Sequence, residues 1–183
     1  MKMMPTIGFN RARDFIHTSA RPLERAIFEL EFEDGSVDDF LRQLSKFQNP
    51  DGGFGRALEP DVRISASSAL CTEIGLRYMA EKKIPSDHFM VQSAVKYLLD
   101  TFDAETQIWR VLPTEANDAP HAPWWHDEAG SLARTFDDFL AIPRAGILAS
   151  LHHFVELVSA EWLNAVIEAT VTKLEQWPTE LRE

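Results

Sequence analysis

Charged and aromatic side chains gather on two stretches that cannot form continuous helices or strands. The first, residues 48–63, is rich in glycine and proline, and the second, residues 102–143, contains several prolines and tryptophans. A histidine or a carboxylate can transfer protons, while a tryptophan face suits a sugar ring or a carbocation. The candidate catalytic residues are therefore Asp61, His126 and Asp127, and the candidate ligand-binding residues are Glu59, Arg63, Trp124 and Trp125.

Each of these residues also has a purely structural interpretation. Asp61 precedes an apolar helical pattern, where aspartate is common as a helix cap, and Glu59 has Arg56 and Arg63 nearby as ion-pair partners. The two adjacent tryptophans would then serve as a packed lid, because large aromatic side chains dominate packing. The sequence leaves both interpretations open.

Metal binding is not indicated by any short ligand spacing. Cys71, His126 or His152 would have to converge with carboxylates from three separate segments. We therefore predict no metal site, and the sequence identifies no cofactor.

The elements that must position these residues are helices with two kinds of apolar pattern. One-sided stripes are expected over 22–32, from Val37 to Gln48, from Met90 to Leu99, and over 160–177. Residues 64–82 and 145–158 are instead apolar on nearly every face, which is typical of buried helices. Ser36, followed three residues later by Asp39, predicts a capped helix start.

The alternation of one-sided and buried helices predicts an all-α fold. Amphipathic helices outside and buried helices inside would give helical hairpins arranged as a partial α/α toroid, roughly half a ring, with 1–183 as one domain or the N-terminal part of a longer toroid. Both connections, 48–63 and 102–143, would then share one rim around a central cavity. An ordinary helical bundle is the alternative.

The glycine-rich turn carries a family resemblance. Gln48-Asn49-Pro50-Asp51-Gly52-Gly53-Phe54-Gly55 resembles the Q-x-x-D-G-G-F/W turn of the prenyltransferase and squalene-hopene cyclase repeats, in which an outer helix leads to an inner one. A degenerate copy runs from Thr101 to Trp109, so the resemblance covers about 36–109. The run after Gly55 looks like that of bacterial proteins carrying such repeats, for which no activity is implied.

The resemblance implies an apolar cavity for a small, isoprenoid molecule and a terpenoid cyclase-like or prenyltransferase-like function. The acidic motifs of those families are incomplete here, since Asp38-Asp39 and Asp137-Asp138 lack the further acids, and Cys71 lacks the preceding aspartate of the zinc motif. Acid/base catalysis by His126 or Asp61 is the mechanism we would expect of an enzyme here. The alternatives are a carbohydrate-active enzyme on a similar toroid, or a non-catalytic scaffold that self-associates.

Composition limits the kinds of partner that we expect for this chain. A formal net charge of −11 disfavours nucleic acid, which requires clustered lysine and arginine. The chain begins without the apolar run of a signal peptide, has no 18-residue apolar stretch, and has a single cysteine, Cys71. We therefore expect a cytoplasmic protein without a membrane span, with a small-molecule ligand or a second copy of itself as partner.

Overall fold

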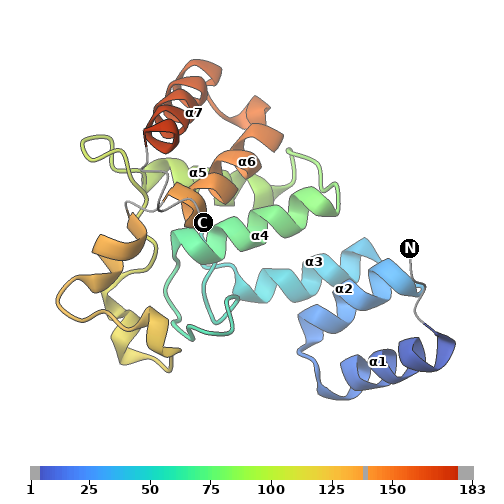
Figure 1. Cartoon of the computed structure of the whole chain (residues 1–183). Helices are drawn as coiled ribbons and strands as arrows, with labels where there is room; N and C mark the ends of the chain where they lie inside the picture. The colour runs from blue at the N-terminus through green and yellow to red at the C-terminus, as the bar shows by residue number, and fades with distance from the viewer. Residues whose placement is uncertain (1–4, 138–139, 177–183) are drawn as a thin grey trace. The chain divides into compact units, whose positions relative to one another are not determined.

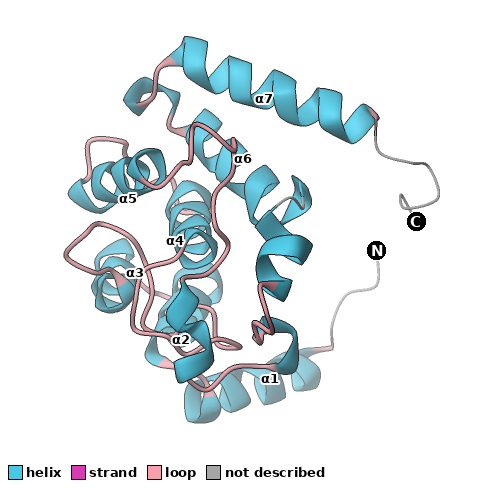
Figure 2. Ribbon diagram, turned by 90° about the vertical axis from the view of Figure 1, so that its left-hand side faces the viewer, coloured by secondary structure: helices cyan, strands magenta, loops and turns pink. Residues whose placement is uncertain are grey.

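Helices dominate the structure, a computed structural model that describes residues 5–137 and 140–176. Within these ranges extended backbone is limited to isolated bridges and no strand forms, which confirms the all-α prediction (Figure 2). The same ranges contain no helix long and apolar enough to cross a bilayer. The chain divides into two compact units, Met1–Lys46 and Phe47–Glu183. The toroidal arrangement stays a prediction.

The first unit contains three helices: α1 (Thr6–Ser19), α2 (Pro22–Phe32) and α3 (Val37–Leu44), with α2 packed against both of the others (Figure 1). Two of these helices begin as predicted. Pro22 opens α2, and the Ser36 hydroxyl caps α3 by accepting the Asp39 N–H at 3.1 Å. Helix α1 was not predicted, and it has no fully buried residue.

The second unit contains α4 (Ala69–Glu81), α5 (Phe89–Asp100), α6 (Gly146–His153) and α7 (Ala160–Glu175). Helix α4 packs against α5 and α6, and α6 packs against α7 (Figure 1). Every residue from Ala69 to Leu76 is buried, so α4 is the central helix that its apolar pattern predicts.

Two predicted helix boundaries are wrong. The helix expected over 64–82 begins only at Ala69, because Ser68 is extended and its hydroxyl accepts the Cys71 N–H at 3.1 Å. The helix expected over 145–158 ends at His153, and a short 3₁₀ turn over Val155–Leu157 follows. The expected end of the last helix, Trp177, lies outside the described residues.

The glycine-rich turn opens the first connection, which we define as residues 48–68. Gln48 and Phe54 form one antiparallel bridge and Phe54 and Ser68 form another, so the turn folds back on both sides of Phe54. Gly52 adopts φ +88°, which glycine tolerates without strain. Phe54 is completely buried and is the apolar anchor of the turn.

The side chain of Gln48 connects this turn to α5. Its Nε2 donates to the Gly52 carbonyl at 2.9 Å and to the Met90 carbonyl, in the first turn of α5, at 3.0 Å. Asp51 closes the turn locally by accepting the Gly53 N–H at 3.0 Å. A glutamine and an aspartate at these positions are therefore explained by hydrogen bonding alone.

The second connection, residues 101–145, begins with a related turn. Asp103 pairs with Ile108 in an antiparallel bridge, and its carboxylate accepts the N–H groups of Glu105 and Thr106 at 2.9 and 3.1 Å. Trp109 follows and is buried, as Phe54 is in the first turn. The described remainder is less irregular than expected, with helical turns at Thr114–Asp118, Pro123–Trp125, Ala133–Asp137 and Leu140–Ala145.

Candidate functional site

The two connections lie against one another, as the sequence led us to expect. The Arg63 N–H donates to the Pro120 carbonyl at 2.9 Å, and the Ala122 N–H donates to the Asp61 carbonyl at 2.7 Å. Between these two hydrogen bonds, Val62 and His121 form an antiparallel bridge. They share no hydrogen bond of their own, and this geometry brings their two Cα atoms to about 4.5 Å from one another. The predicted site residues of both stretches thus occupy one region of the second unit.

On the first connection, the predicted residues mostly serve the backbone. The Glu59 carboxylate accepts the Asp61 N–H at 3.2 Å, while Asp61 and Arg63 pair through their main chains and expose their side chains. Asp61 is not the cap of α4, a role that Ser68 performs. The structural interpretation of Asp61 as a helix cap was therefore wrong.

On the second connection, two histidines form a relay. The His121 Nδ1 lies 2.6 Å from the Ala119 carbonyl, which can only accept, so Nδ1 carries the proton in the neutral ring. The other nitrogen, Nε2, then accepts from His126 Nδ1 at 3.0 Å, and the two rings stack at 5.2 Å. This tautomer assignment leaves the Nε2 lone pair of exposed His126 available as a base.

The adjacent tryptophans do not form one platform. Trp124 is 58% exposed, whereas Trp125 is 7% exposed and packs on Phe136 with ring centroids 5.0 Å apart. The buried Trp125 Nε1 has no hydrogen-bond partner among the described residues. Trp124 alone is available to a ligand from solvent.

Asp127 orders its own loop. Its carboxylate accepts the Leu132 N–H at 3.0 Å and the Ser131 hydroxyl at 3.3 Å. Its backbone exchanges two hydrogen bonds with the Asn117 side chain, at 2.7 and 2.8 Å. The carboxylate is thus held as the cap of the helical turn that begins at Ser131.

The incomplete acidic motif of this region is also structural. Asp137 accepts the Val111 N–H at 3.0 Å, and burial raises the pKa of its carboxyl. Its neighbour Asp138 lies outside the described residues.

A cavity of about 310 Å³ opens where the end of the first connection, the last turn of α5 and the second connection meet. Its polar lining includes Ser67, Tyr97, Thr101, Asp103 and Arg110, and its apolar lining includes Ile108 and Leu112. This cavity lies on the predicted connections but is lined by other residues than those that the sequence singled out. Nothing in the local sequence pattern marks them, since they converge only through the fold.

The hydroxyl of Ser67 is fixed at the cavity wall. It donates to the Asp51 carboxylate at 2.8 Å and accepts from Asn49 Nδ2 at 3.0 Å. The glycine-rich turn therefore positions one polar group of the cavity directly. Burial raises the pKa of the neighbouring Tyr97 to about 12, and the nearby Asp51 and Cys71 add to the shift.

We expect Tyr97 to stay protonated until about pH 12 in the folded protein. Because its pKa lies above the ordinary value near 10, its contribution to folding stability is complete below pH 10 and is lost as the pH rises through 12. Near-ultraviolet titration of tyrosinate should show this late step, and Tyr97→Phe should remove it. A wild-type protein that is still folded by circular dichroism and whose tyrosines all ionise near pH 10 would contradict the assignment.

A second buried polar group lies between α4 and α6. Glu73 is 7% exposed, accepts from Arg77 Nε at 3.0 Å and lines a cavity of about 200 Å³ with Ser150 and His153. A Cβ at Gly146 would lie 2.6 Å from the Glu73 carboxylate, so glycine permits the close approach. Burial raises the pKa of Glu73, opposed by the charge of Arg77.

We expect wild-type protein to gain stability relative to Glu73→Gln as the pH falls. Because folding raises the pKa of Glu73, its favourable contribution to folding stability is complete below pH 4.5, the pKa in the unfolded chain. This contribution is lost as the pH rises through the pKa in the folded protein. Urea unfolding at several pH values between about 4 and 7 measures the difference. Glu81→Gln, which changes a half-exposed carboxylate 3.7 Å from the same arginine, is the control and should lack this trend.

The sequence predicted no metal site, but one group of potential metal ligands does converge in the structure. Within the described ranges, one set of three potential ligands lies close enough to hold an ion: His17, Glu29 and Glu33. The sequence analysis missed it, although Glu29 and Glu33 have the i,i+4 spacing that places two side chains on one helix face.

Comparison with protein-family models, with curated proteins and with solved structures yields no match. The functional argument therefore depends on the geometry of this chain.

Proposed function

We propose that the protein binds a small molecule in the 310 Å³ cavity at the junction of the two connections. The observation that carries this proposal is the convergence of Ser67, Tyr97 and Arg110 on one cavity from three separate segments. Its volume is at the lower end of the range typical of ligand pockets, about 300–1,000 Å³. The ligand is correspondingly compact.

The lining favours an amphiphilic ligand. Arg110 offers a charged donor for a carboxylate or phosphate, although the Asp103 carboxylate lines the same cavity and interacts with Arg110. Ile108 and Leu112 offer apolar contacts for a short hydrocarbon body. A small isoprenoid with an anionic end satisfies both requirements and agrees with the family resemblance of the glycine-rich turn. The proposal includes the partial α/α toroid, supported by the burial of α4 from Ala69 to Leu76 and by the two related turns at 48–54 and 103–108.

The second candidate function is acid/base catalysis by His126. The relay from the Ala119 carbonyl through His121 favours it, because the relay orients the His126 ring and leaves its Nε2 outside these hydrogen bonds. This function would use the region around the Val62–His121 pair and include the exposed Arg63 as a ligand contact.

The two candidates are distinguished by matched arginine variants of the full chain. Thermal shift and calorimetry with short isoprenyl phosphates, simple carboxylates and sugars would identify a binding probe. Arg110→Gln should then weaken binding about tenfold or more, the effect of losing one charge-assisted hydrogen bond, whereas Arg63→Gln should not. Weakening by Arg63→Gln alone would favour the histidine region, and absence of binding by all probe classes would contradict the proposal.

A further inference from the structure

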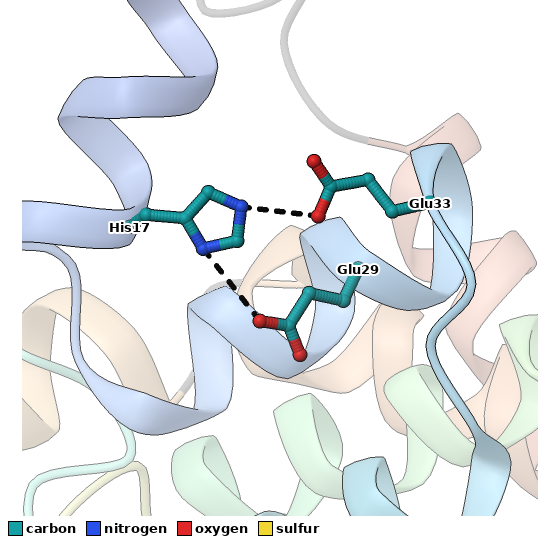
Figure 3. A group of neighbouring side chains, drawn as sticks. All are labelled: His17, Glu29 and Glu33. Carbon is teal, nitrogen blue, oxygen red and sulfur yellow. Dashed lines mark hydrogen bonds and ion pairs between the residues drawn. The ribbon is translucent and has the colours of Figure 1, made fainter.

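An imidazole and two carboxylates meet in the first unit, and none of the three belongs to the candidate sites described above. His17 comes from the last turn of α1, Glu29 from α2, and Glu33 is the extended residue that directly follows α2 (Figure 3). Glu33 Oε2 lies 3.0 Å from His17 Nε2, and Glu29 Oε1 lies 3.6 Å from His17 Nδ1. Figure 3 shows the ring held between the two carboxylates.

These separations are close to those of ligands that share one ion. One ligand atom from each residue lies within 4.8 Å of the others. Zinc binds nitrogen and carboxylate oxygen at about 2.0–2.2 Å in tetrahedral sites, so two ligands of one ion are about 3.4 Å apart. Because Glu29 faces Nδ1 and Glu33 faces Nε2, one of the two glutamate side chains must rotate toward the other nitrogen for all three groups to bind one ion.

The surroundings favour a cation. Glu29 and Glu33 also border a cavity of about 550 Å³ that is lined by acids and one glycine, with Asp34 and Asp39 as the further acids. The cations nearby are engaged otherwise, since Arg42 pairs with Asp39 and Arg25 Nη1 donates to the His17 carbonyl at 3.3 Å. The cavity leaves room for water at the remaining coordination positions.

The ring of His17 is also positioned by apolar contact. The Phe28 ring packs edge-on against it with centroids 5.8 Å apart. Phe28 itself stacks on Phe9 at 6.0 Å, so aromatic packing between α1 and α2 supports the imidazole. Such support reduces the ordering that a bound ion would require.

We propose that His17, Glu29 and Glu33 bind one divalent transition-metal ion, with zinc as the ion that this ligand set fits best. Imidazole together with carboxylates suits zinc, whereas magnesium and calcium prefer oxygen ligands alone. Three protein ligands leave an open position for water or another molecule, as in catalytic rather than structural zinc sites. This proposal is independent of the ligand cavity in the second unit.

Equilibrium dialysis of the chelator-treated full chain against zinc tests the proposal. We expect one tightly bound zinc per chain, a rise in melting temperature on adding zinc, and no comparable effect of magnesium. Glu33→Gln should weaken zinc binding by at least the 10–100-fold that loss of an outer-shell partner costs. Glu31→Gln, on the same helix but outside the cluster, is the matched control and should bind as wild type does.

X-ray absorption of the zinc-loaded wild-type protein gives a readout that needs no variant. It should show imidazole and oxygen ligands at about 2.0–2.2 Å and no sulfur. Sulfur ligation, equal binding by wild type and Glu33→Gln, or no bound zinc would overturn the proposal. The last result would identify the cluster as a contact of His17 with two carboxylates that holds no metal ion.

Discussion

Replacing Phe54 by alanine is expected to lower the free energy of unfolding by about 3–5 kcal/mol. The side chain is fully buried, and its ring lies so close to α4 that a Cβ at Gly75 would be 2.7 Å from it. Its backbone N–H also donates to the Thr72 hydroxyl at 2.9 Å, which fixes the turn on the helix. Removal of the ring leaves a cavity between them, and urea unfolding measures the cost.

Phe89→Ala is the matched control, because Phe89 is 65% exposed in the first turn of α5. Its unfolding free energy should change by less than about 0.5 kcal/mol. A double-mutant cycle with Gly75→Ala adds a direct test of the contact. The methyl group that Gly75→Ala adds should destabilise the wild-type protein by about 1–3 kcal/mol. It should destabilise the Phe54→Leu variant by less, because the smaller side chain leaves room for it. Equal costs in both backgrounds would contradict the contact.

Replacing Trp109 by alanine should cost about 3–5 kcal/mol as well. Trp109 is 3% exposed, and its Nε1 donates to the Leu98 carbonyl at 2.7 Å. Its ring contacts Phe102 at 4.6 Å and faces the guanidinium of buried Arg144 at 5.8 Å. Alanine would therefore remove aromatic packing and the face against which the arginine lies.

Trp124→Ala removes the same side chain from a 58% exposed position of the same connection. Its unfolding free energy should stay within about 0.5 kcal/mol of wild type. Thermal and urea unfolding of the two variants give the comparison. Similar losses in both variants would contradict the burial of Trp109 and the exposure of Trp124.

Local signals predicted the helices well where those signals were strong. Pro22 and Ser36 mark helix starts that the structure reproduces, and the all-round apolar pattern identified α4 as buried. Helix α1 was not predicted because it has no fully buried residue and thus no clear apolar stripe. The start of α4 was placed too early because buried Ile64 belongs to extended backbone that precedes the Ser68 cap.

The candidate site was predictable only as a region. Glycine and proline identified the two connections, and the hydrogen bonds of Arg63 and Ala122 bring them together. Which side chains line the cavity depends on how distant segments come together, as Ser67 and Arg110 do at its wall, and no spacing in the sequence records this. The same limitation concealed the convergence of His17 with Glu29 and Glu33.

The most direct test of the account is nuclear magnetic resonance of the backbone where the two connections pair. The account predicts a strong Overhauser effect between the Hα atoms of Val62 and His121, whose pairing brings their Cα atoms to about 4.5 Å. It also predicts slow hydrogen exchange at the amides of Arg63 and Ala122. The absence of this cross-peak, together with exchange of both amides as fast as in unpaired loops, would contradict the pairing of the two connections.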